Sequence, residues 1–184
     1  MKLKLITPTM STPITLEQAK AYYRVIGDEE NEVIERTITT AISKAEQKTN
    51  RQLMGASSYE GYMDTFPNAV VLPKPPFISL SKIEYVDIEG ETQLWEDYEI
   101  DDFVEPAVLH FLSKPIDANG KLNSIKITFD CGYIDLPEPI VSWCLIYGLT
   151  LFENRENLVI GTIVSEKAKD YYNHLLDSYR IIPV

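Results

Sequence analysis

The sequence predicts an α+β protein, in which two N-terminal and two C-terminal helices form a helical core that carries an inserted antiparallel β-sheet or sandwich. Two observations predict this class. Apolar residues recur every three or four positions before residue 55 and after residue 137, and they tend to alternate with polar residues in between. We therefore expect a single domain over 1–184, with the helical core in 14–55 and 137–181 and the β insertion in 56–136.

The first helix is predicted within "TLEQAKAYYRVIG", after an N-terminal tail of residues 1–14. Thr15 and Gln18 have the spacing of a capping box, in which each side chain accepts a hydrogen bond from the backbone N–H of the other residue. Gly27 is expected to end this helix, because glycine readily adopts the left-handed conformation found just beyond helix C-termini.

A second, longer helix is predicted within "DEENEVIERTITTAISKAEQKTNR". Asp28 is expected to cap it, and the glutamates that follow favour the positive end of the helix dipole. One face of this helix is apolar, because the residues at spacings of three and four are Ile34, Ile38, Ala41, Ile42 and Ala45.

The middle third of the chain has the period of two that is typical of strands. The pattern is clearest in "SIKITFDCGY", where Ile125, Ile127 and Phe129 alternate with polar residues. Strands are predicted at 70–72, 79–89, 97–101, 107–112 and 124–133.

Turn signals separate these strands. Glu89-Gly90 and Asn119-Gly120 are dipeptides that favour hairpin turns. The prolines in 73–76 precede the strand that is predicted at 79–89. Because proline lacks an N–H group and has a fixed φ, we expect these residues to form a rigid lead that sets where this strand begins.

The C-terminal third returns to helices. Pro137 and Pro139 precede "IVSWCLIYGLTLFENRE", which is apolar almost all round, as expected of a helix buried in its own core or against a partner. The apolar loop "NLVIGTIV" follows. A last helix, capped by Ser165, is predicted within "SEKAKDYYNHLLDSYR", before the apolar end "IIPV".

Composition limits the class of protein. Hydrophobic residues make up 45% of the 184 residues, enough for a substantial core. No run approaches the length of a membrane span, and we expect no signal peptide. The net charge of −11 argues against a sequence-reading DNA-binding protein, which needs a basic face. It is compatible with a wall along which DNA passes, or simply with a well-solvated surface.

Chemical motifs are absent from the sequence: it contains no P-loop, G-x-G-x-x-G, H-E-x-x-H or G-x-S-x-G pattern. His110 and His174 are isolated, and Cys131 has no partner nucleophile or base nearby in sequence. Glu99 and Asp101 would share one face of a strand, but a solvated strand end is a better interpretation than a calcium or magnesium site. We therefore expect no catalytic residue, no cofactor and no metal.

Five segments resemble, in order, the head–tail connector (adaptor) proteins of tailed bacteriophages and prophages, in the branch with a β insertion in a helical core. The resemblance spans about residues 13–181. Asn50 stands where that family often has glycine, and both residues adopt the left-handed conformation at a helix end. The segments are the two predicted N-terminal helices ending in "TNRQL", then "VLPKPPFISLSKIEYVDIEG", "IKITFDCGYIDLPEPI", "LFENRE" and "LLDSYR".

The resemblance implies a structural virion protein without enzyme activity or cofactor. Such proteins form rings of about twelve copies below the portal, where heterologous contacts close by rotation. The implied partners are copies of the chain itself, the portal protein and the downstream neck and tail completion proteins, with DNA only as passing cargo and no membrane. The implied location is the head–tail junction of the virion, after synthesis in the cytoplasm of the host bacterium.

Other functions stay open at this point. The main alternative is a β-domain ligand- or receptor-binding module of a phage or prophage particle, which would present a concave aromatic site. A hydrolase with a carboxylate pair is a third hypothesis. A two-helix DNA reader is a poor fourth, because Glu29, Glu30 and Glu32 would meet the phosphates.

Two apolar segments are the predicted interfaces with partners. We expect partners to order the loop 158–164 and the C-terminal segment 179–184, so that deleting 180–184 impairs assembly more than folding. The interface residues are Leu158, Val159, Ile160, Ile163, Val164, Tyr179, Arg180, Ile181, Ile182 and Val184.

Overall fold

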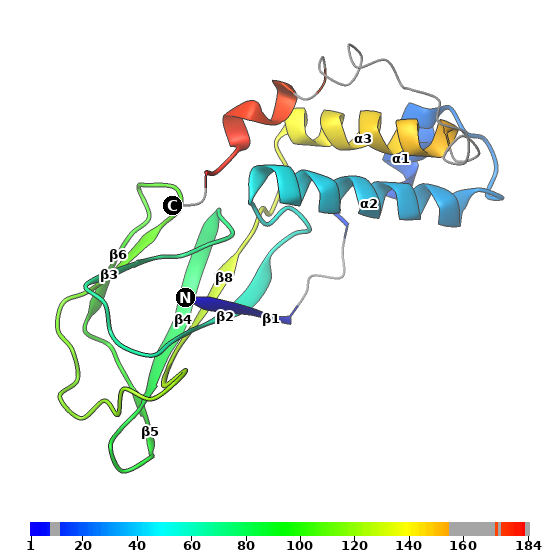
Figure 1. The fold of residues 1–184 in the computed structure, drawn as a ribbon. Coiled ribbons are helices and arrows are strands. Elements are labelled where there is room, and N and C mark those ends of the chain that lie inside the picture. Colours follow the sequence, from blue (N-terminus) through cyan, green and yellow to red (C-terminus); the bar gives the residue numbers. More distant parts are fainter. Residues whose placement is uncertain (8–11, 155–171, 173, 183–184) are drawn as a thin grey trace. The chain divides into compact units, whose positions relative to one another are not determined.

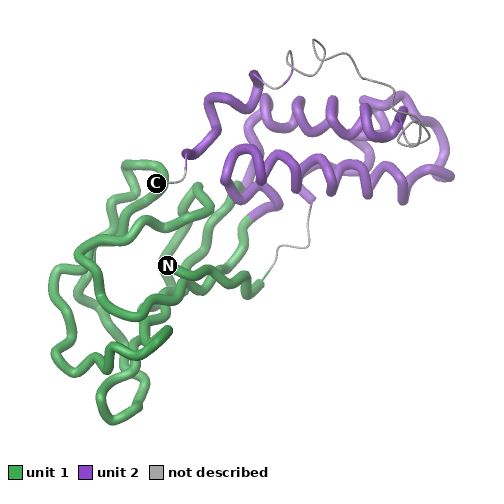
Figure 2. Tube along the Cα trace, in the orientation of Figure 1, with its two compact units in different colours: residues 1–10, 56–133 green, residues 11–55, 134–184 purple. Residues whose placement is uncertain are grey.

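The computed structural model describes residues 1–7, 12–154, 172 and 174–182 (Figure 1). It divides into two compact units (Figure 2). The β unit comprises residues 1–10 and 56–133, and the helical unit comprises residues 11–55 and 134–184. Helices and antiparallel sheets together make this an α+β protein, as predicted. In the part of the chain that the structure describes, no helix is long and apolar enough to cross a membrane.

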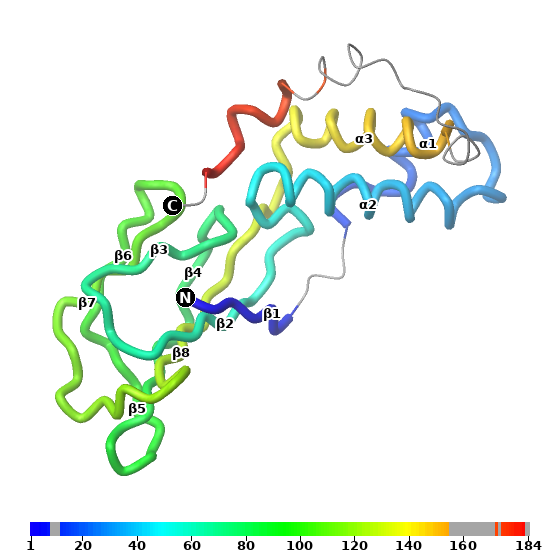
Figure 3. The backbone as a smooth tube through the Cα atoms, in the orientation of Figure 1, coloured from blue at the N-terminus to red at the C-terminus, as the bar shows by residue number. Residues whose placement is uncertain are grey.

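The described residues of the β unit form two antiparallel sheets. The larger has the strand order β1-β2-β8-β4-β5, and Figure 3 shows β1 beside β2. The smaller has the order β3-β7-β6. The strand bounds are β1 (Lys2–Thr7), β2 (Ser57–Met63), β3 (Ala69–Val71), β4 (Phe77–Val86), β5 (Thr92–Leu94), β6 (Tyr98–Asp101), β7 (Val108–Phe111) and β8 (Ile125–Cys131).

Strand β8 is the centre of the larger sheet. It pairs with β2 on one side and with β4 on the other, so that Ile127 lies opposite both Gly61 and Ile83. Its residues alternate strictly between buried and half-buried, which confirms the alternation predicted for Ile125, Ile127 and Phe129.

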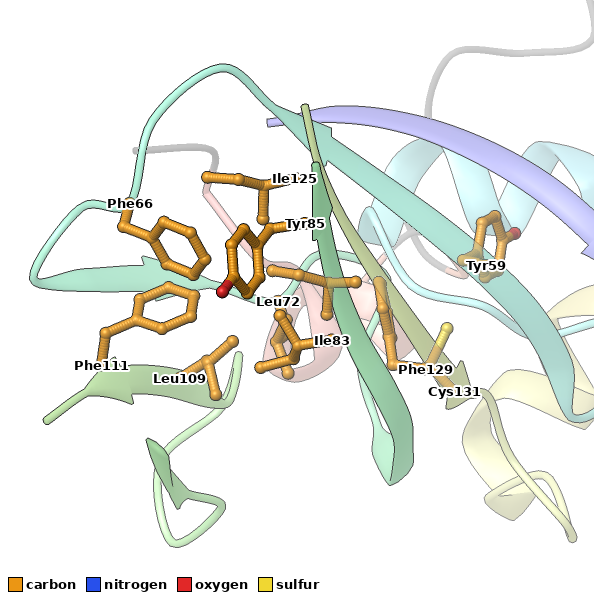
Figure 4. Packing of buried hydrophobic residues seen from close by; sticks show 11 residues of the cluster. Tyr59, Phe66, Leu72, Ile83, Tyr85, Leu109, Phe111, Ile125, Phe129 and Cys131 are labelled. Carbon is orange, nitrogen blue, oxygen red and sulfur yellow. The ribbon is translucent and has the colours of Figure 1, made fainter. Parts of the chain in front are cut away.

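Apolar side chains of both sheets form one core (Figure 4). Aromatic rings meet edge to face within it: the centroids of Phe66 and Phe111 are 5.0 Å apart, and those of Phe66 and Tyr85 are 5.8 Å apart. The β unit is therefore a sandwich. The buried members are Tyr59, Phe66, Leu72, Ile83, Tyr85, Leu109, Phe111, Ile125, Ile127, Phe129 and Cys131.

The helical unit begins with α1 (Leu16–Tyr23), whose predicted capping box is confirmed. The backbone N–H of Gln18 donates to Thr15 Oγ1 (3.2 Å), and that of Thr15 donates to Gln18 Oε1 (2.8 Å). The predicted C-terminal stop at Gly27 is wrong. The helix ends at Tyr23 because Arg24 already adopts the left-handed conformation, with φ 58°.

Helix α2 (Asn31–Thr49) buries the predicted apolar face, from Ile34 to Ala45. The predicted cap at Asp28 is wrong. The Asp28 carboxylate instead accepts hydrogen bonds from Lys20 Nζ (2.7 Å) and from the side-chain amide of Asn31 (3.2 Å). The helix begins at Asn31 with Glu30 at the N-cap position, two residues after Asp28, and it has no side-chain cap.

Helix α3 (Glu138–Glu153) buries one face most deeply, including Ile140, Trp143 and Cys144. The ring of Trp143 stacks on Tyr147, with centroids 4.9 Å apart. Gly148 lies against the hydroxyl of Tyr23, so closely that an added Cβ would clash with it. Of the predicted last helix, the structure describes Tyr172 and the 3-10 helix η2 (His174–Tyr179); Ser165 lies outside the described residues.

Three further differences concern the β unit. The predicted tail at 1–14 contains β1, which pairs with β2, a strand that the sequence analysis did not assign. The Asn119-Gly120 turn does not form a hairpin, because the strands on either side of it, β7 and β8, belong to different sheets. The Glu89-Gly90 turn does join the paired strands β4 and β5, and β4 begins at Phe77, directly after the prolines.

Replacing Phe129 by alanine should lower the free energy of unfolding by about 3–5 kcal/mol, because it leaves a cavity in the centre of the core. Urea denaturation followed by circular dichroism measures the change. Ile116→Ala is the control, since the Ile116 side chain is fully exposed. Equal effects of the two substitutions would contradict the assignment of the core.

Candidate assembly surfaces

The sequence-predicted chemical residues do not come together in the described part of the chain. No group of three or more His, Cys, Asp or Glu there could hold a metal ion. His110 lies on β7 opposite Glu99 of β6, and His174 Nδ1 lies 2.9 Å from Asp177 Oδ2. Asp101 accepts a hydrogen bond from the backbone of Phe103 (3.1 Å), as expected of an ordinary strand end.

Both cysteines are buried, and neither forms a disulfide. Burial raises the pKa of the Cys144 thiol to about 12, so that it stays protonated at neutral pH. A protonated, buried thiol is a poor nucleophile. Cys131 lies in the core of the sandwich, in contact with apolar neighbours.

Residues at the end of α2 and just after it bind the C-terminal segment, which the sequence analysis predicted as an interface. Arg51 Nε donates a hydrogen bond of 2.6 Å to the carbonyl oxygen of Tyr179. The backbone N–H of Ile181 donates to the carbonyl oxygen of Thr49 (2.9 Å), and the side-chain amide of Asn50 donates to the carbonyl oxygen of Ile181 (2.7 Å). Residues 179–181 therefore lie against their own helical unit, a position that the sequence analysis did not foresee.

The residues that hold this segment belong to "TNRQL", one of the segments that resemble the connector family. Asn50 is left-handed, with φ 57°, so the chain turns away from the helix axis there. Arg51 is buried, and Leu53 is completely inaccessible to solvent. The carboxylate of Glu46 accepts hydrogen bonds from the backbone N–H groups of Leu53 and Met54, at 2.8 and 2.9 Å, which fixes the chain after the turn.

This segment presents one apolar and one charged side chain to solvent. Ile182 is 77% exposed, Arg180 is exposed, and Tyr179 and Ile181 are half-buried. The other predicted interface residues, Leu158, Val159, Ile160, Ile163, Val164 and Val184, lie outside the described residues.

A second surface was missed from the sequence. Large apolar side chains stand exposed on loops of the β unit, including Ile88 at the tip of the β4–β5 hairpin, Phe103, and Ile116. The backbone N–H of Ile88 donates to the carbonyl oxygen of Asp117 (2.8 Å), which brings Ile88 close to Ile116. Exposed apolar residues that gather in this way are typical of contact surfaces. The alternating pattern placed Ile88 inside the predicted strand 79–89, so its exposure in a turn could not be recognised from periodicity.

Asp87 organises the hairpin tip. Its carboxylate accepts hydrogen bonds from the backbone N–H groups of Glu89 (3.0 Å) and Glu91 (2.9 Å) and from the Gln93 side-chain amide (2.9 Å). The Gln93 bond, followed by the backbone bonds, holds the pKa of Asp87 below its usual value. Gly90 completes the turn, with φ +96°.

Comparison with known proteins gives a likeness in fold. No family model matches the sequence, and no curated protein matches it. A chain from the neck of an empty GTA particle, computed with C6 symmetry, matches with a TM-score of 0.80 and 15% identity. A chain from the virion of a native gene transfer agent (GTA) particle matches at 0.79 and 16%, and one from the neck of the native particle, computed with C12 symmetry, at 0.70 and 17%. Each match covers 100% of this chain and 97% of the other.

Arg51→Ala should loosen the C-terminal segment, because it leaves the partly buried carbonyl of Tyr179 without this donor. We expect a loss of about 1–3 kcal/mol in stability and faster hydrogen exchange at the amide of Ile181. Mass spectrometry or NMR measures the exchange. Arg36→Ala, at an exposed position on α2, serves as the control. Unchanged exchange in Arg51→Ala would contradict the anchoring role.

Acid should loosen the β4–β5 hairpin through Asp87. A carboxyl whose pKa is lowered by folding contributes stability that is present above the unfolded pKa of about 3.9 and is lost as the pH falls through the folded pKa. Amide exchange at Glu91 should therefore increase as the pH is lowered below about 3.9, after correction for the intrinsic rate. Asp87→Asn should flatten this dependence, whereas the exposed substitution Asp102→Asn should leave it unchanged. A pH dependence that survives in Asp87→Asn would refute the assignment.

Proposed function

We propose that this chain is a head–tail connector, or adaptor, subunit of a phage-like particle. In this role, copies form a ring below the portal and link the capsid vertex to the neck and tail while DNA passes through. The observation that carries the proposal is the match in fold to a chain from a particle neck, at a TM-score of 0.80 over the whole of this chain. The match includes both the sandwich and the helices, so it does not rest on one common module.

The ring is supported by the symmetry of the matched particles. Their necks were computed with C6 and C12 symmetry. A cyclic assembly requires two different, complementary surfaces on every subunit. The chain offers separate candidates: the C-terminal segment with Ile182 on the helical unit, and the apolar loops with Ile88 and Ile116 on the β unit.

The charge of the chain is compatible with DNA as cargo. A net charge of −11 disfavours contact with phosphates, because tight binding to DNA depends on lysine and arginine that displace counterions. A ring of such subunits would repel the duplex and let it move. This argument rests on the net charge of the whole chain.

The alternative of a ligand- or receptor-binding module receives less support. It requires a concave aromatic site on the sheet. In the described β unit, Phe66, Tyr85 and Phe111 pack against one another in the core. They are therefore committed to packing between the sheets and do not form a platform for a ligand.

Electron microscopy of the purified protein, alone and with the portal protein of the same particle, tests the proposal. We expect rings of the chain, alone or seated on the portal. Particles that stay monomeric under both conditions would overturn it. Portal protein from an unrelated particle serves as the control for non-specific adhesion.

Ile182→Asp tests the C-terminal segment more sharply than deletion of 180–184, since that deletion also removes the bond between Ile181 and Thr49. The Ile182 side chain is mostly exposed, so the free energy of unfolding should change by less than about 0.5 kcal/mol. Ring formation should weaken, because a charge would enter an apolar contact. Sedimentation velocity measures assembly, with Ile26→Asp, at a fully exposed position, as the control. Normal assembly of Ile182→Asp would exclude this residue from the interface.

A further inference from the structure

The larger sheet ends in two open edges. Strands β1 and β5 occupy its two ends, and no described residue pairs with their outer sides. All three residues of β5 are exposed, and so are all residues of β1 except the half-buried Leu3. Unpaired N–H and C=O groups at such edges are templates for strands from another chain.

The two edges carry opposite charge. Strand β1 contains Lys2 and Lys4, and the first acidic residue in the sequence is Glu17. The stretch 83–113, which includes β5, contains no lysine or arginine. Its ten acidic residues are Glu84, Asp87, Glu89, Glu91, Glu96, Asp97, Glu99, Asp101, Asp102 and Glu105.

Three of these carboxylates flank β5 and are available to a partner. Glu89 and Glu91 lie at the hairpin tip before the strand, and Glu96 follows it. All three are exposed, and among the described residues their side chains form no ion pair or hydrogen bond. At the edge strand β6 of the smaller sheet, two nearby carboxylates already accept hydrogen bonds, Asp97 from Ser113 and Asp101 from Phe103, whereas Glu99 and Asp102 are exposed as well. The choice between β5 and β6 is therefore part of the test.

Exposed apolar side chains accompany both edges. Leu5 and Ile6 on β1 are 45% and 42% exposed, and Leu94 on β5 is 63% exposed. An edge strand that carries both open backbone groups and exposed apolar side chains is a site for strand addition.

We propose that β1 of one copy adds to the β5 edge of the next, so that the larger sheet continues from subunit to subunit. Lys2 and Lys4 of one copy then lie against the acidic residues around β5 of its neighbour. Like charges oppose the symmetrical pairings of β1 with β1 and of β5 with β5. The contact is therefore head-to-tail, the kind that a closed ring requires; it rests on the proposed ring and specifies one contact between its subunits, with a different surface from each copy.

Edge lysines have a second physical explanation, which the experiment must separate from the first. Lysine on an edge strand can protect a protein from unwanted strand addition. Under that explanation, removing the positive charges would leave assembly unchanged or increase it. Under the proposal, it abolishes assembly.

The test exchanges charges between the edges. Variant A is Lys2→Glu/Lys4→Glu, and variant B is Glu89→Lys/Glu91→Lys. Each alone has edges of equal sign and should lose the rings, or the portal-bound rings, that the unaltered chain forms. A 1:1 mixture of A and B should assemble again, with alternating subunits, and so should the quadruple variant that carries all four changes.

Controls separate this effect from misfolding and from net charge. Lys44→Glu/Lys114→Glu alters the net charge by the same amount as variant A, at exposed positions outside β1, and should assemble normally. Circular dichroism of A and B should match that of the unaltered chain. Rescue by mixing is itself a control, because misfolded subunits would not restore one another. Assembly of A or B alone, or failure of both the mixture and the quadruple variant, would overturn the proposal.

Cross-linking keeps the contact testable apart from ring formation. Leu5→Cys and Leu94→Cys in one chain should give a ladder of disulfide-linked oligomers at high protein concentration, while the buried Cys131 and Cys144 stay silent. A ladder without rings supports this contact and counts against the adaptor function. Rings that form without a ladder and without charge dependence support the adaptor function and refute the β1–β5 contact. A ladder that forms only when Leu5→Cys is combined with Glu99→Cys would identify β6 as the true partner and refute β5.

Discussion

The need to satisfy backbone N–H and C=O groups is the constraint on which the rest of this structure depends. In the middle of the larger sheet, β8 satisfies it on both sides, and the buried alternation of the core follows from that position. At the end of α2, the helix leaves carbonyl groups without intrahelical partners. The chain returns after more than a hundred residues to supply a donor from Ile181. At β1 and β5, the described chain supplies no partner, and those edges are where we place the contact between copies.

Local chemistry made several elements predictable. The Thr15–Gln18 capping box depends only on residues three apart, so the sequence contained the whole interaction. The alternation of Ile125, Ile127 and Phe129 was readable for a similar reason, because β8 is covered on one face along its full length. In each case the residues that determine the element lie within a few positions of one another in the sequence.

Long-range partners explain what could not be predicted. Strand β1 is short, and its Lys2–Leu3–Lys4 pattern becomes a strand only because β2, more than fifty residues later, pairs with it. Asp28 looked like a cap, but the helix begins only at Asn31, and the Asp28 carboxylate accepts hydrogen bonds from Lys20 and Asn31 instead. The role of Arg51 required knowing that Tyr179 lies beside it, 128 positions away in the chain. Of the interface residues, Tyr179 and Ile181 were chosen for their apolar character, whereas the polar residues that hold them gave no local signal.

The close approach of Gly148 to Tyr23 constrains how this protein can diverge. Any side chain at position 148 would meet the tyrosine hydroxyl, so a larger residue there must be matched by a smaller one at position 23. The two positions should therefore vary as a pair among distant relatives. At identities as low as 15%, where the sequences themselves no longer align with certainty, such a compensating pair would be a marker for recognising further members of this fold.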